Sequence, residues 1–296
     1  FIEGRPHYEM SHRSEELREL DFLYRNEPNL ALGHGCSASW ARESSNVTEI
    51  SSTFFPTHEI MLADPNRGGS EDPFGEYDLS IARLSETEEY SQLDSLCAAY
   101  DEWIETQRGL LESERSCLDV LEYQIGLSNL EKASDCSSRI KTGVDLLRAE
   151  KNDDVRRAFR LMNEAMLEQR RDPNQPEAVR HFKWRPFQLA FILMNLPGIS
   201  DPENSDREVA DILWFPTGGG KTEAYLGCIA YSIFLRRIRH PNSGGVTAVM
   251  RYTLRLLTSD QFDRAARLIC AMEVTRREKL SHTSVPISLG MWVGHK

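Results

Sequence analysis

Apolar residues change their spacing twice along the chain of 296 residues. Within residues 1–80 a short helical pattern precedes a stretch rich in β-branched and aromatic residues, which predicts a small mixed α+β segment. Within residues 81–171 apolar side chains recur at steps of three and four, as one face of an amphipathic helix requires. This second part is therefore predicted to be mainly α-helical, with its interleaved acidic residues exposed to solvent.

Residues 172–296 show a third pattern, in which short apolar runs alternate with longer amphipathic stretches. We expect three buried strands, in the runs ADILWFP, GGVTAVMRY and VPISLGMWVG. The stretches KTEAYLGCIAYSIFLRRIR and SDQFDRAARLICAMEVTRREK are expected to be helices. Buried strands that alternate with helices form parallel sheets, so this part predicts an α/β domain with a parallel sheet. The chain stops directly after the third expected strand, and we expect the domain to be truncated there.

Three glycines separate the first expected strand from the helix that follows it, in the sequence DILWFPTGGGKTEAYLG. A strand, a glycine-rich turn and a helix start gather backbone N–H groups and the positive end of a helix around one point, which is a site for phosphate. Gly218, Gly219 and Gly220 permit backbone angles and a close approach that side chains would block. With Thr217 before them, they are the candidate nucleotide-binding loop.

Lys221 and Thr222 follow these glycines. The lysine is expected to reach the outer phosphates of ATP, and the threonine hydroxyl to coordinate Mg²⁺. The match to the general motif GxxxxGK[ST] is incomplete, because Phe215 stands where the first glycine belongs. PTGGGKT instead resembles the shorter phosphate loop of superfamily 2 helicases and translocases. That resemblance implies a RecA-like motor domain that hydrolyses ATP, with Lys221 and Thr222 as catalytic residues.

The segment WRPFQ precedes the loop and ends at Gln188, 33 residues before Lys221. It resembles the element of superfamily 2 enzymes in which a glutamine binds adenine. A glutamine amide can bond both the N6 amino group and N7 of that base. The simpler interpretation of Gln188 is a polar residue on the surface of a helix.

The segment MRYTLRLLTSDQ, residues 250–261, follows the second expected strand. It lies where superfamily 2 enzymes keep their first DNA-contacting motif. Hydroxyls, arginines and a helix N-terminus suit contacts to DNA phosphates, so Thr253, Arg255 and Thr258 are the candidate DNA-binding residues. Helix capping and surface charge are the simpler roles for the same three side chains.

Several longer segments, spread from about Leu30 to Met272, resemble the helicase family of bacterial DISARM antiphage systems. These segments are LALGHGCSASW, LCAAYDEWIETQ, AFRLMNEAMLEQRR, WRPFQLAFILMNLPGI, WFPTGGGKTEAYLG and GGVTAVMRYTLRLLTSDQFDRAARLICAME. The resemblance implies a large helicase-like ATPase that binds DNA and works with a DrmB-like partner protein of the same operon. It also implies a second motor half, which would supply the arginines that complete the ATP site.

The acidic DExx motif of superfamily 2 enzymes does not follow Lys221. Glu223, Glu273 and Glu278 lie in helical patterns, where the carboxylate at the end of a strand would not be. We therefore expect this chain to be an N-terminal or internal portion of a longer polypeptide, which binds nucleotide weakly and hydrolyses none alone.

The net charge of −11 is unevenly distributed. Residues 51–150 carry 21 acidic and 8 basic side chains, a net charge of −13, whereas residues 231–296 carry 4 acidic and 11 basic ones, a net charge of +7. Surface charge acts locally, because salt screens it over about 10 Å, so the basic part can bind nucleic acid although the whole chain is acidic.

Two other functions stay open at this point. ATP could switch a DNA sensor or scaffold that clamps DNA without unwinding it, with the acidic helical region as a docking surface or a mimic of DNA. An ATPase that acts on proteins is disfavoured by the arginine-rich stretch after the second expected strand.

The remaining composition excludes several classes of site. No apolar run reaches the ~18 residues of a membrane-spanning helix, so we expect a cytoplasmic protein without membrane contact. The six cysteines form no CxxC pair, which is typical of reduced thiols and not of a zinc site. GHGC, residues 33–36, is predicted to be a tight turn, and IEGR, residues 2–5, fits native sequence or the remnant of a tag.

Overall fold

The computed structural model describes most of the chain, in two compact units. One unit comprises Phe1–Leu62 with Trp103–Ser134, and the other comprises Ala63–Glu102 with Asp135–Lys296. The described residues are 15–23, 37–43, 46–53, 79–172, 174, 176–215, 218–251, 255–280 and 285–292. The stretches GHGC and IEGR lie outside them, as do Thr217 and Thr253.

The first unit contains a helix and a two-stranded antiparallel sheet. These are α1 (Glu15–Leu23), β1 (Ser37–Glu43) and β2 (Asn46–Thr53), with Ser37 opposite Thr53. The unit also includes part of α3 (Ser91–Ser113), the short turn η2 (Arg115–Cys117) and part of α4 (Val120–Arg148).

Gly126 of α4 leaves room for two buried side chains of the first unit. A Cβ added there would lie 2.6 Å from a methyl carbon of Leu111 and 3.0 Å from the ring of Phe22. Both of these side chains are buried. Because real Cβ atoms do not approach so closely, a larger residue at position 126 would force the Leu111 side chain to shift.

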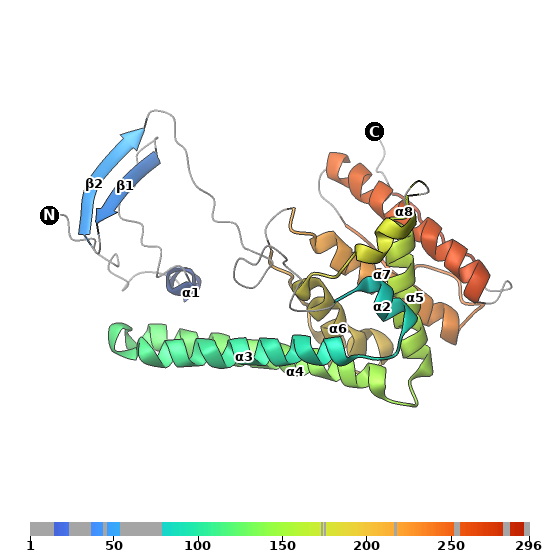
Figure 1. The fold of residues 1–296 in the computed structure, drawn as a ribbon, viewed down its shortest axis with the longest axis horizontal. Helices are drawn as coiled ribbons and strands as arrows, with labels where there is room; N and C mark the ends of the chain where they lie inside the picture. Colours follow the sequence, from blue (N-terminus) through green and yellow to red (C-terminus); the bar gives the residue numbers. More distant parts are fainter. Residues whose placement is uncertain are drawn as a thin grey trace. The chain divides into compact units, whose positions relative to one another are not determined.

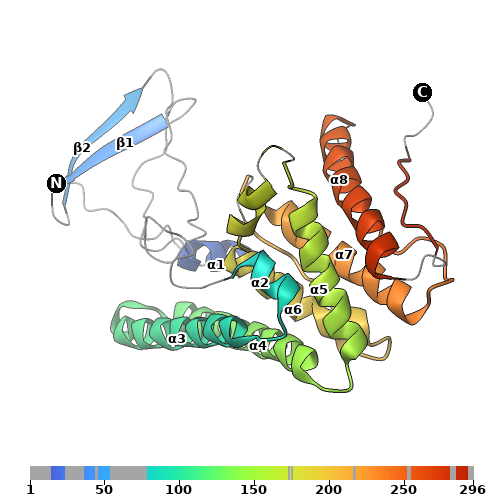
Figure 2. The ribbon, with the colours of Figure 1, turned by 45° about the vertical axis from the view of Figure 1, so that its right-hand side comes forward.

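The second unit is a layered arrangement of helices (Figures 1 and 2). Its elements, besides the remaining parts of α3 and α4, are α2 (Ile81–Glu86), α5 (Asp153–Glu168), η3 (Pro176–His181), α6 (Pro186–Ser200), η4 (Ser205–Glu208), α7 (Lys221–Arg239) and α8 (Arg255–Lys279). Helix α5 packs against α2, α7 and α8, and α6 packs against α7. The largest fully buried side chains of this core are Trp184, Tyr231, Phe159 and Phe234.

The prediction of a parallel-sheet, RecA-like motor domain is wrong for the structure. Among the described residues, the paired strands are β1 and β2, which are antiparallel. The segments 211–215, 244–251 and 285–292, where strands were expected, have no strand assignment. Apolar runs form strands only where other strands pair with them. Each of these runs carries an exposed apolar side chain, at 89% for Ile212, 83% for Val249 and 96% for Trp292, although Ile287 is buried.

The helices expected between those runs do form. Helix α7 begins at Lys221, directly after the glycines, and three arginines stand in its last turn, where cations stabilise the negative end of a helix. The described part of the second helix, α8, begins at Arg255. Among the described residues, no helix is both long and apolar enough to cross a bilayer.

Candidate phosphate site

The glycine-rich loop has the backbone geometry that its sequence requires. Gly218 has φ of 84° and Gly220 has φ of 89°, a left-handed conformation that costs other residues about 1–2 kcal/mol. A Cβ at Gly220 would also lie only 2.6 Å from the side-chain nitrogen of Gln188. Gly220 is the N-cap of α7, so the loop lies at the N-terminal end of that helix, where the helix dipole is positive.

Arg185 and Gln188 hold this loop from the start of α6. Gln188 Nε2 donates a hydrogen bond of 2.7 Å to the Gly220 carbonyl, and Arg185 Nη1 donates one of 2.5 Å to the Gly219 carbonyl. Gln188 Oε1 accepts from the backbone N–H of Arg185 at 2.9 Å, and the glutamine is 5% exposed. The structure therefore brings Gln188 to the glycines, and both ends of its amide are already bonded within the protein.

A buried hydrogen bond fixes the segment that carries Arg185 and Gln188. Trp184 Nε1 donates to Asn163 Oδ1 of α5 at 2.7 Å, and both side chains are at most 1% exposed. The Trp184 backbone N–H also donates to the Leu79 carbonyl at 2.9 Å. The start of α6 is thereby attached to α5, so the side chains that hold the loop have a rigid base.

The segment before the loop is anchored to α4. Arg139 donates two hydrogen bonds to Asp211, of 2.6 and 2.8 Å, and a third of 2.9 Å to Asp206. These bonds raise the pKa of Arg139, and all three side chains are at most 25% exposed. The ion pairs hold residues 206–211 in place, a few residues before the glycines begin.

Lys221 is engaged with the protein itself. Its Nζ donates to the carbonyl of Phe215, whose ring stacks on Phe187 with centroids 4.1 Å apart. Lys221 and Thr222 are the first two residues of α7 and are partly exposed. The lysine thus lies at the loop, where it could exchange a neutral carbonyl for an anionic phosphate.

Two arginines that the sequence analysis did not single out stand near the loop, around Glu223. Glu223 Oε1 forms an ion pair with Arg264 of α8, and Arg170 Nη2 lies 3.9 Å from the same oxygen. Burial lowers the pKa of Arg170, whose guanidinium covers the Phe182 ring at 4.7 Å. The net positive charge of residues 231–296 was the signal for Arg264, but no spacing rule joined Arg170 to it.

Glu273 is unsuited to the role of a free catalytic carboxylate. Its oxygens accept hydrogen bonds from Arg276 at 2.7 and 2.8 Å, from Arg277 at 2.9 Å and from the backbone N–H of Ile287 at 2.9 Å. The bonds from Arg276 are the main reason that its pKa falls to about 2. Glu273 therefore anchors the segment after α8.

The candidate DNA-binding residues are only partly covered by the described part of the chain. Arg255 is the first residue of α8 in its described bounds, and Thr258 lies one turn further along. Their side chains fall outside the described residues, as does the whole of Thr253. The backbone therefore puts two of the three in the first described turn of α8.

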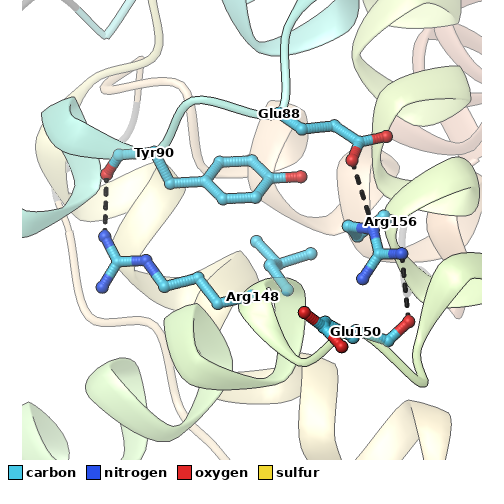
Figure 3. Close-up of a pocket in the computed structure, with 6 residues that line it drawn as sticks. Glu88, Tyr90, Arg148, Glu150 and Arg156 are labelled. Atoms are coloured by element: carbon cyan, nitrogen blue, oxygen red, sulfur yellow. Dashed lines mark hydrogen bonds and ion pairs between the residues drawn. The ribbon is translucent and has the colours of Figure 1, made fainter.

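A pocket of about 310 Å³ lies in the second unit between the residues before α3, the end of α4 and the start of α5 (Figure 3). Both arginines of the pocket have acidic partners: Arg156 lies 3.4 Å from Glu88, and Arg148 donates to Asp94 at 2.5 Å. Burial raises the pKa of Tyr90 to about 12. The Tyr90 hydroxyl and Arg156 Nε are buried without a hydrogen-bond partner among the described residues, so the pocket keeps two unsatisfied donors beside its ion pairs. Among the described residues no cluster of three or more His, Cys, Asp or Glu could hold a metal ion.

The glycine conformations, the helix start and the lysine together make this loop the candidate phosphate site of the chain. No family model matches the chain. Over an alignment of 305 residues it is 38% identical to DISARM protein DrmA of Bacillus paralicheniformis (strain ATCC 9945a / NCIMB 11709 / CD-2). The alignment covers 93% of this chain and 26% of the relative, so the chain spans about a quarter of that protein. The chain is DrmA-like, which confirms the resemblance to this protein of the DISARM antiphage systems.

Proposed function

We propose that the chain is the ATP-binding part of a DNA helicase or translocase that serves a bacterial antiphage defence system. The observation that supports this most directly is the loop at Gly218–Gly220, which opens into α7 at Lys221 and is held by Arg185 and Gln188. Its occurrence in a DrmA-like chain supports a role in the defence system. A DrmB-like protein of the same operon is the partner that we propose.

The residues around the loop fit a nucleotide phosphate. Backbone N–H groups at the positive end of α7 and the Lys221 ammonium would bind it, and the Thr222 hydroxyl would hold Mg²⁺. Bound ATP with Mg²⁺ would supply the free energy of hydrolysis that drives movement along DNA. Lys221 would leave the Phe215 carbonyl, because an anionic oxygen is a stronger acceptor for an ammonium than a neutral one.

Adenine recognition by Gln188 is part of the same proposal. Its amide nitrogen bonds the Gly220 carbonyl, so adenine contact would require the base to share or replace that bond. Binding of the base to Gln188 would therefore also change how this side chain holds the loop at Gly220. Thr253, Arg255 and Thr258 would meet DNA phosphates near the start of α8.

Steady-state ATP hydrolysis by the full-length protein, with and without single-stranded and duplex DNA, tests this function. We expect a DNA-dependent rise that Lys221→Ala abolishes, while the exposed control Lys151→Ala leaves the rise intact. Hydrolysis that DNA raises without any strand separation would support the DNA sensor or clamp instead. No hydrolysis and no nucleotide binding, even with the partner protein present, would refute the motor assignment.

A further inference from the structure

An ion-pair cluster beside the phosphate loop joins three helices of the second unit. Glu223 is the third residue of α7, Arg264 belongs to α8, and Arg170 follows the end of α5. Both guanidinium groups face the same carboxylate oxygen, Glu223 Oε1. The three side chains are 19%, 32% and 28% exposed, so water screens their interaction less than on an open surface.

The other carboxylate oxygen of Glu223 is directed toward the loop. Glu223 Oε2 is buried and has no hydrogen-bond partner among the described residues. It would lie 3.3 Å from a Cβ placed on Gly220, beside the glycine that begins α7. A negative oxygen this close to Gly220 lies near the positive end of the helix, where it would repel an incoming phosphate.

We infer that Glu223 competes with nucleotide phosphates at the loop, and that Arg264 and Arg170 exchange this carboxylate for the phosphates when nucleotide binds. This inference rests on the proposed function, because it presumes that the loop binds nucleotide. Arg264 lies on α8, whose first described residue is the candidate DNA contact Arg255. The exchange of partners therefore couples the phosphate loop to the helix proposed to meet DNA.

The coupling acts in both directions. Nucleotide draws Arg264 away from Glu223 and so displaces α8. DNA that binds better to the displaced α8 then tightens nucleotide binding, by the same factor by which nucleotide tightens DNA binding. Glu223 sets the size of this effect, because among the described residues it supplies the carboxylate that pairs with Arg264 in the empty loop. A merely structural ion pair, in contrast, would stabilise the contact of α7 with α8 and leave nucleotide affinity alone.

The test is the affinity of the full chain for a fluorescent ATP analogue with Mg²⁺, compared with Glu223→Gln, Arg264→Gln and the double variant. Glutamine keeps a hydrogen bond to Arg264 but removes the competing charge, so Glu223→Gln should tighten binding by about threefold or more. Arg264→Gln should weaken binding by about threefold or more, since it removes a cation that the phosphates would gain. Glu208→Gln and Arg267→Gln, exposed positions on η4 and α8, are the charge-matched controls and should change affinity by less than about twofold.

Amide hydrogen exchange in α8 provides the second measurement. Nucleotide should alter exchange of residues 265–279 in the wild-type chain and in Arg267→Gln, but not in Arg264→Gln. Unchanged affinity in Glu223→Gln with a lower melting temperature would overturn the inference and leave the cluster a structural contact. If the wild-type chain bound no nucleotide, or bound it equally after Lys221→Ala, the proposed function itself would fail and this exchange with it.

Discussion

Alanine substitutions at three glycines separate the effects of backbone strain and close contact at the phosphate loop. Gly220 has φ of 89° and lacks space for a Cβ, Gly218 has φ of 84° with open space around it, and Gly109 lies within α3 with nothing within 4 Å. The series therefore changes one physical cause at a time. Gly109 is the matched control, because only its helical conformation is at stake.

The structure sets the order and the approximate size of the three effects. Gly109→Ala should stabilise the fold by up to about 1 kcal/mol, since alanine is the better helix former. Gly218→Ala loses about 1–2 kcal/mol to left-handed strain, offset in part by about 0.4–1 kcal/mol from a less flexible unfolded chain. Gly220→Ala adds the displacement of Gln188, whose hydrogen bond to the loop is worth about 1 kcal/mol, for a net loss of about 1–2.5 kcal/mol after the same offset.

Urea unfolding, followed by circular dichroism at one temperature, measures the three free energies of unfolding. The expected order of stability is Gly109→Ala, then the wild-type chain, then Gly218→Ala, then Gly220→Ala. Equal stability of the two loop variants would show that Gln188 does not press on Gly220. A stabilising effect of either loop variant would refute the left-handed geometry.

Three further predictions address the base of the loop, the anchor after α8 and the DNA contact. Trp184→Phe leaves the buried Asn163 oxygen without its donor and should cost about 1–3 kcal/mol of unfolding free energy in urea, whereas an Asn163→Leu change on that background should recover part of it. The pKa of Glu273 is lowered to about 2 chiefly by Arg276, so its carboxylate stabilises the fold fully above pH 4.5 and progressively less as the pH drops toward 2. In Glu273→Gln the melting temperature should depend less on pH across that range. DNA affinity should fall steeply from low to moderate salt, and Arg255→Ala should reduce the slope of log affinity against log salt by about 1 in a titration series, whereas an unchanged slope would exclude a phosphate contact there.

The helices were predictable because their signals are local. The start of α7 follows from a glycine-rich turn followed by an amphipathic stretch, and the arginines near its end suit its dipole. The fate of the three apolar runs was not predictable in the same way, since an apolar run becomes a strand only with hydrogen-bond partners from elsewhere in the chain. Ile212 and Trp292 belong to runs that look buried in sequence, yet both side chains are exposed in the structure.

The candidate site shows the same division between local and distant information. The approach of Gln188 to Gly220 joins two segments 32 residues apart, and only the family resemblance anticipated that they belong to one site. The convergence of Arg170 and Arg264 on Glu223 depends on how α5, α7 and α8 pack. No spacing in the sequence encodes that packing, so charge composition indicated a basic region without naming its members.

The most direct measurement is equilibrium binding of an ATP analogue with Mg²⁺ to the chain, beside its Lys221→Ala and Lys151→Ala variants. Binding that Lys221→Ala weakens by about tenfold or more, with no change in Lys151→Ala, is the predicted result, since a charge-assisted bond to phosphate contributes about 1.5–3 kcal/mol. No detectable binding at millimolar nucleotide, or the same affinity in all three proteins, would contradict the assignment of residues 217–222 as a phosphate site.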